Sequence, residues 1–221
     1  MLFKLSVFSG LSIGIGVCIG WLRFYKMDRS YLPFLLLLTL GFISELGSLA
    51  MVKHHGSNIA ILNIYSLAEV LLFLWQFNNW QSQRPYRRKL LLTTFAAVAF
   101  WAAEWMYRGT LWQPFSGCII LFAATLIFLS MAIVVRQLYP LLLPLRSNAL
   151  FIIGLGLIFC NTCTVITETC WLLLPGTMAA PMRAMVVIFA AVNFLSNLLF
   201  IWSIFYIPPR FRYIFRSSSA V

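Results

Sequence analysis

The chain has 221 residues, of which 62% are hydrophobic and only 10% are charged. Soluble domains need roughly a quarter of their residues as Asp, Glu, Lys or Arg, so this composition excludes a soluble globular protein and indicates a chain solvated by lipid. The net charge of +11 comes from basic residues scattered over several short segments. This scatter argues against nucleic-acid binding and is typical of membrane topology and of contact with anionic lipid headgroups.

Seven apolar segments are each long enough to cross a bilayer, for which about 20 residues suffice. The predicted transmembrane helices are 5–24, 31–52, 58–77, 89–108, 116–138, 148–174 and 180–207. The connections between them are short, so no extramembrane segment is long enough to fold alone. The sequence therefore predicts an all-α integral membrane protein in which residues 1–221 form a single seven-helix domain.

The first apolar segment also has features of a signal peptide, because Lys4 precedes an apolar run. No A-x-A-like cleavage site follows it, so we expect the segment to be retained as the first helix. Its removal would leave six helices with both chain ends in the cytoplasm, and this alternative would also satisfy the distribution of positive charge.

The basic residues predict the orientation of the helices. Twelve of the sixteen lie in the loops after the first, third and fifth helices or in the C-terminal tail. Since cytoplasmic loops retain Lys and Arg, we expect the N-terminus outside and the C-terminus in the cytoplasm of a cell that carries the protein in its inner or plasma membrane. The residues expected to contact lipid or a cytoplasmic partner are Arg84, Arg87, Arg88, Arg210 and Arg212.

Four of the five acidic residues, Glu45, Glu69, Glu104 and Glu168, fall within the predicted helices. A charged group at the centre of a bilayer costs at least ~2.5–3.5 kcal/mol. We therefore expect these carboxyl groups to face the interior of the bundle, to be paired, or to be protonated. Counted from the outer helix ends, Glu69 lies near the midplane and the other three share the outer half, which predicts an outward-facing polar cavity. Glu104 has a simpler alternative, an ion pair with Arg108 on the same helix.

Further polar and aromatic side chains lie on the predicted helices that carry the acids, or on the last helix. Beyond the four acids, the candidate ligand- or ion-binding residues are Asn63, Ser66, Asn193, Asn197, Trp101 and Trp171. Polar and small residues on one helix face also serve helix packing in membranes, and tryptophans gather at membrane interfaces, so both explanations stay open. Arg183, at the outer end of the last helix, is a candidate partner that would neutralise Glu168 or Glu45.

The cysteines and histidines do not indicate a metal or redox centre. All five cysteines lie inside predicted helices. Cys160 and Cys163 are spaced C-x-x-C, and on a helix we expect them to pack as small apolar residues. His54 and His55 are adjacent in a predicted outer loop, where polar loop residues are a simpler interpretation than metal ligands. The sequence predicts no cofactor and no metal site.

Short matches between the two halves of the chain suggest an internal repeat. Three segments recur in the same order: FSG (8–10 and 115–117), FISE and VITE (42–45 and 165–168), and LLFLW and LLFIW (71–75 and 198–202). These matches predict a three-helix unit, a linking helix and a second parallel three-helix unit. The residues that would be equivalent are Glu45 and Glu168, Ser66 and Asn193, and Glu69 and Ser196.

We predict a non-enzymatic membrane protein that binds a small molecule or a cation in the acidic cavity. A small-solute or proton-coupled transporter fits first, because transporters built from repeats bind substrate between the repeats near the midplane. One alternative is a seven-helix receptor, sensor or assembly partner that acts through a separate cytoplasmic protein. The other is an intramembrane lipid hydrolase with glutamates as general acid and base, although the sequence shows no recognisable nucleophile–base pair.

Overall fold

The computed structural model describes residues 2–80, 84–138, 145–173 and 179–209, with the side chains of residues 2–4, 84–87 and 179–183 excepted. All regular elements of these described ranges are helices. They are α1 (Leu2–Leu11), α2 (Ile13–Arg23), η1 (Phe24–Lys26), η2 (Arg29–Tyr31), α3 (Leu32–His55), α4 (Ile59–Trp80), α5 (Arg84–Arg108), α6 (Ser116–Leu138), η3 (Leu145–Ser147), α7 (Ala149–Leu173) and α8 (Ala179–Tyr206).

Within the described ranges, seven helical spans are long and apolar enough to cross a membrane, and α1 and α2 together with η1 form the first of them. This confirms the predicted all-helical chain with seven spans, and the architecture is compatible with a polytopic membrane protein. The helix ends differ from the predicted ones by a few residues. For example, α4 continues past the predicted end at residue 77 to Trp80, because the Trp80 ring packs against Tyr31 and Phe77 at centroid distances of 5.6 and 5.9 Å.

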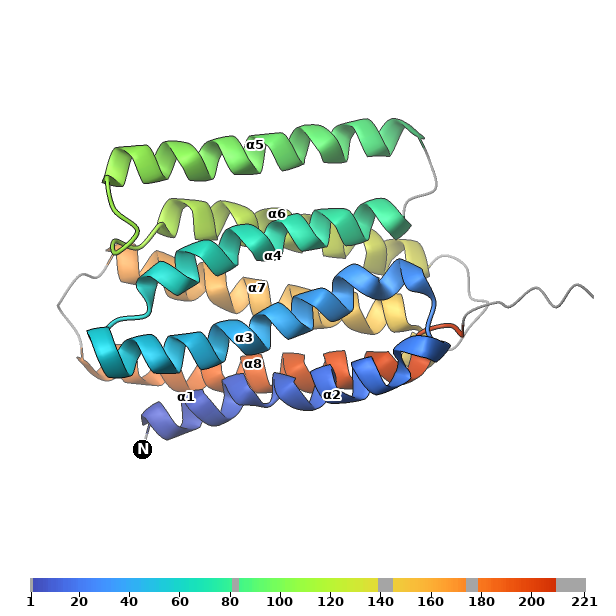
Figure 1. The fold of residues 1–221 in the computed structure, drawn as a ribbon, viewed down its shortest axis with the longest axis horizontal. Coiled ribbons are helices and arrows are strands. Elements are labelled where there is room, and N and C mark those ends of the chain that lie inside the picture. Colours follow the sequence, from blue (N-terminus) through green and yellow to red (C-terminus); the bar gives the residue numbers. More distant parts are fainter. Residues whose placement is uncertain (1, 81–83, 139–144, 174–178, 210–221) are drawn as a thin grey trace, which may run out of the picture.

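The contacts between the spans connect six of the seven into a closed ring, and the remaining helix, α5, lies at the edge of the bundle (Figure 1). Around the ring, the contacts run from α1 and α2 to α3, α4, α6, α7, α8 and back to α1 and α2. The outer helix, α5, packs against α4 and α6. Only 11% of the apolar membrane-crossing stretch of α5 is buried inside the bundle, compared with 39% of the corresponding stretch of α7. The interior that can hold a site is therefore enclosed by every span except α5.

An apolar core fills the ring at the end where α3 begins and α8 ends. Phe34, Leu38 and Ile204 are fully buried there, and the ring of Phe34 packs edge-on against Phe200 at a centroid distance of 5.8 Å. In lipid, such close packing stabilises helix association through dispersion contacts, because the surrounding hydrocarbon is as apolar as the side chains. This end of the bundle is consequently closed.

A buried glutamine fixes the start of α3 against α4. The first turn of a helix has N–H groups without partners inside the helix, and α3 has no side-chain cap from Tyr31. The side chain of Gln76, which is fully buried, accepts a hydrogen bond from the Phe34 N–H at 2.8 Å and donates one to the Ser30 carbonyl at 2.6 Å. One amide therefore satisfies two backbone groups and sets the position of α3 relative to α4.

Replacement of this glutamine tests its role. Gln76→Leu should lower the free energy of unfolding by about 1–3 kcal/mol, because the Phe34 N–H and the Ser30 carbonyl lose buried partners. Thermal unfolding of the purified protein in detergent measures the loss. Asn79→Ala is the matched control, because Asn79 is exposed and its hydrogen bond to the same carbonyl is long, at 3.5 Å. Equal stability of the two variants would contradict the proposed role of Gln76.

Candidate functional site

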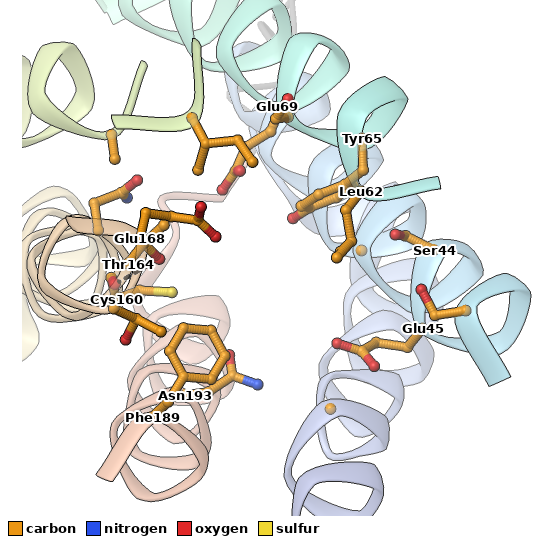
Figure 2. Close-up of a pocket in the computed structure, with 18 of the residues that line it drawn as sticks. Ser44, Glu45, Leu62, Tyr65, Glu69, Cys160, Thr164, Glu168, Phe189 and Asn193 are labelled. Atoms are coloured by element: carbon orange, nitrogen blue, oxygen red, sulfur yellow. Dashed lines mark hydrogen bonds between the residues drawn. The ribbon is translucent and has the colours of Figure 1, made fainter. Parts of the chain in front are cut away.

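A cavity of about 400 Å³ lies inside the helix ring (Figure 2). Its lining comes from all six ring spans and from none of the residues of α5. Ser6, Asn58 and Val186, which lie near helix ends, line one end of the cavity, whereas Gly41 and Asn161 from the middle of their helices line its deeper part. The cavity thus occupies the half of the bundle opposite the apolar core.

Three of the four predicted intramembrane acids line this one cavity. Glu45 comes from α3, Glu69 from α4 and Glu168 from α7, and all three side chains are partly buried. Figure 2 shows the carboxyl groups of Glu45 and Glu168 on opposite walls, directed toward the space between them. Three different helices therefore direct carboxyl groups into the same volume.

The carboxyl group of Glu45 lies against Gly10 of the first span. A Cβ atom built on Gly10 would overlap Oε2 of Glu45, so the missing side chain provides the space that the carboxyl group occupies. Among the described residues, Glu45 accepts no hydrogen bond and forms no ion pair. Its carboxyl oxygens are thus available to a ligand or to water.

Glu168 is held on the other wall by the start of α6. The hydroxyl of Ser116, the first residue of α6, donates a hydrogen bond to Oε2 of Glu168 at 2.8 Å. The helix N-terminus also carries a partial positive charge, which favours a carboxyl group at this position. Because this hydrogen bond involves Oε2 alone, the other carboxyl oxygen has no partner among the described residues and can bind a ligand.

Glu69 lines the deep end of the cavity, which is called its floor below. It also lines a smaller pocket of about 50 Å³, whose other lining residues include Leu37, Phe73 and Phe200 of the apolar half. Ten residues separate Glu69 from Ile59 and eleven from Trp80, so it sits about 15 Å from either end of α4. In the part of the chain that is described, Glu69 has no hydrogen bond and no ion pair. The carboxyl group therefore lies between the polar and the apolar halves of the ring.

Glu104, the fourth acid, does not line the cavity, because α5 is outside the ring. It forms an ion pair with Arg108 at 3.7 Å, which was the alternative prediction. Its Oε2 also accepts a hydrogen bond from the Cys118 N–H at 2.7 Å. Cys118 is the third residue of α6, so Glu104 caps the first turn of a neighbouring helix. These partners account for the acid without a ligand.

Asn63, another candidate ligand-binding residue, is also placed outside the cavity. Its fully buried amide donates to the carbonyls of Leu111 and Gln113 at 2.9 and 2.8 Å, and its oxygen accepts from the Phe115 N–H at 3.0 Å. Trp101, a further candidate, donates from its indole N–H to the Asn63 carbonyl at 2.9 Å. These residues therefore hold the connection between α5 and α6, and the side chain of Asn63 has no polar group free for a ligand.

The remaining predicted residues divide between the cavity wall and the surface. Ser66, Asn193 and Asn197 line the cavity. The Asn197 amide donates to the Ser9 carbonyl at 3.1 Å and to the Ser12 hydroxyl at 3.0 Å, so it mainly joins α8 to the first span. Trp171 does not line the cavity, and 52% of it is exposed.

Two cavity residues outside the predicted set have polar groups without partners. Ser48 lies one turn after Glu45 on α3, is 8% exposed and makes no hydrogen bond to any other described side chain or backbone group. Asn161 on α7 is 5% exposed, and its amide donates to the Leu157 carbonyl at 3.0 Å while its oxygen accepts no bond from the described residues. In the sequence, the i, i+3 spacing of Glu45 and Ser48 indicates that both lie on the same face of α3.

The predicted basic residues are described only in part. Arg88 is exposed on α5, whereas Arg210 and Arg212 lie outside the described residues. The side chains of Arg84, Arg87 and Arg183 also lie outside the described part, so the pairing of Arg183 with Glu168 or Glu45 stays a prediction. Both His54 and His55 are exposed, and no group of three or more His, Cys, Asp or Glu among the described residues has a geometry that could hold a metal ion.

Thiol labelling tests whether water and ions reach the cavity. A Ser48→Cys variant should react faster with a cationic methanethiosulfonate than with an anionic one, by about 10-fold, because the carboxyl groups attract positive reagents. Peptide mass spectrometry after short exposures measures both rates and separates the new thiol from the native cysteines. Ser130→Cys on α6 is the control, since Ser130 is fully buried and does not line the cavity. Equal, slow labelling at both positions would show that the cavity is closed.

Comparisons with known proteins do not assign the chain to a family. No protein-family model, no curated protein and no solved structure matches it. The chemistry of the cavity is therefore the basis for the function proposed below.

Proposed function

We propose that this chain is a multi-pass protein of the cell membrane that transports a small cation or cationic solute coupled to protons. The supporting observation is that Glu45, Glu69 and Glu168, from three different helices, line one cavity. None of the described residues that line it is basic. Carboxyl groups enclosed by apolar walls act through a low dielectric, which strengthens their attraction for a cation.

The three acids are suited to different tasks. Glu45 and Glu168 lie on the walls of the wide part of the cavity (Figure 2) and would bind the solute. Glu69 lies at the floor, in the middle of its helix, and would take up and release the proton, since carboxyl groups near the midplane serve as proton relays in transporters. Proton binding at Glu69 and cation binding at the other two acids would then be coupled, because together they neutralise the charge of the cavity.

The position of the cavity in one half of the ring supports a transport cycle. The cavity occupies one half of the ring, and Phe34, Leu38 and Ile204 fill the other half. With the orientation proposed from the basic residues, the cavity faces outward and the apolar core closes the cytoplasmic side. Transport would require this core to open while the outer end closes, as alternating access demands.

The contacts between helices support the proposed repeat. If α1–α4 and α6–α8 are two three-span units, each span of one unit lies opposite its equivalent in the ring, and α5 is the outer linking helix. Each FSG segment also meets the glutamate of the next span. Gly10 lies against Glu45, and Ser116 donates to Glu168. This relation favours transport over the receptor and hydrolase alternatives, because a cavity between two repeats is the usual place for a transported solute.

Proton movement in proteoliposomes tests the proposal. A pH-sensitive dye inside the vesicles should report proton flux when a panel of small organic cations is added outside: methylammonium, butylammonium, 1,4-diaminobutane and choline. Glu69→Gln should abolish this flux, because the amide cannot exchange a proton.

Glu104→Gln is the matched control and should retain the flux, since Glu104 lies outside the cavity and its amide oxygen can still accept from Cys118. If no cation in the panel moves protons with the unmodified protein, the transport proposal is wrong. If Glu69→Gln transports normally, Glu69 is not the coupling residue.

A further inference from the structure

We infer that the solute bound by this cavity is a short aliphatic diamine, whose two ammonium groups bind Glu45 and Glu168 separately. The inference rests on the proposed cation site and adds the class of cation. It follows from how far apart the two carboxyl groups lie, what surrounds each of them, and what lines the space between them.

The separation follows from the helix ring. α3 and α7 occupy opposite positions among the six ring spans. Adjacent helix axes are about 8–10 Å apart and a helix with side chains is about 10–12 Å wide, which leaves roughly 4–10 Å between opposite side chains. Glu45 precedes the end of α3 by ten residues and Glu168 the end of α7 by five, so their depths differ by about 7 Å. Together these offsets separate the carboxyl groups by roughly 8–13 Å.

This separation is too long for a single ammonium group. One nitrogen with two charge-assisted hydrogen bonds of about 2.8 Å spans only about 6 Å. The remaining distance of roughly 2–7 Å matches two nitrogens joined by about two to five methylene groups. A metal ion would need its ligands to converge at about 2–2.6 Å, and the opposed carboxyl groups do not converge in this way.

An unpartnered hydroxyl at the cavity wall fits one of the two ammonium groups. An ammonium has three N–H donors. On α3, the hydroxyl of Ser48 is one turn from Glu45, nine-tenths buried and without a partner in the described structure. On α7, Asn161 is 5% exposed and its oxygen accepts no bond from described residues, but it lies two turns before Glu168, about 10 Å along the helix, and is too far to share the ammonium at Glu168. The Ser48 hydroxyl lines the cavity and can therefore accept a further hydrogen bond from the ammonium at Glu45.

Part of the surface between the two acids is apolar. Leu62 and Phe189 face the same space as the acids in Figure 2, and Ile119 and Phe122 of α6 also line it. The methylene groups of a diamine pack favourably on these apolar side chains. A volume of about 400 Å³ lies within the range of small-molecule pockets.

The charge of a diamine leaves one of the three acids, Glu69, to bind a proton. A diamine with two positive charges neutralises Glu45 and Glu168 and leaves Glu69 to be neutralised by a proton. The occupied cavity is then neutral overall, which removes the cost of uncompensated charge inside the membrane.

Ligand binding to the purified protein in detergent tests the inference without requiring transport. 1,4-Diaminobutane should bind at least about 10-fold more tightly than 1-aminobutane, which has the same carbon chain and one ammonium, because the second charged hydrogen bond is lost. Glu45→Gln and Glu168→Gln should each reduce the affinity for the diamine to about that for the monoamine. Glu104→Gln should leave both affinities unchanged. Titration calorimetry measures all of these values.

A series of diamines with two to eight methylenes provides a measurement that needs no variant. Affinity should be highest at about two to five methylenes and fall for longer chains. Equal affinity of diamine and monoamine, or no dependence on chain length, would overturn the diamine inference even if cations drive proton flux. Tight, length-dependent diamine binding without proton flux would support the inference and reject transport.

Discussion

The cost of a carboxyl group in hydrocarbon is the constraint on which this structure depends. At mid-bilayer an acid must find a partner or leave contact with lipid, and the chain meets this requirement in two ways. Glu104, on the peripheral helix, is paired with Arg108 and caps α6. Glu45, Glu69 and Glu168 instead face a common interior cavity. The ring arrangement of the helices is what makes the second solution available.

Hydrogen bonds at helix ends keep this ring in place around an open volume. Gln76 fixes the first turn of α3 on α4, and Asn63 fixes the connection that leads into α6. Asn197 joins α8 to the first span where the ring closes. Rigid elements positioned in this way can hold side chains apart across a cavity, which loosely packed helices would fill.

The sequence predicted the number and approximate limits of the helices because each span is a continuous apolar run. It also identified the acids that line the cavity, since their cost in lipid can be read from composition alone. For Glu104 it offered the ion pair with Arg108 as an alternative without deciding between the two, and it did not separate Asn63 and Trp101 from Ser66 and Asn193. These residues are of similar types and occupy similar positions within apolar helices. They differ in whether their helix belongs to the ring and in which backbone groups lie nearby.

The sequence by itself determined that the chain is a seven-span helical protein with acids inside its apolar segments, because hydrophobicity and helix length are local properties. Only the tertiary structure decided that α5 lies outside the ring, that Glu45 and Glu168 face each other, and that Ser48 and Gly10 belong to the site. The reason is that lipid is as apolar as most of these side chains. The apolar pattern therefore does not specify which helix faces meet, and close packing together with buried hydrogen bonds selects the arrangement.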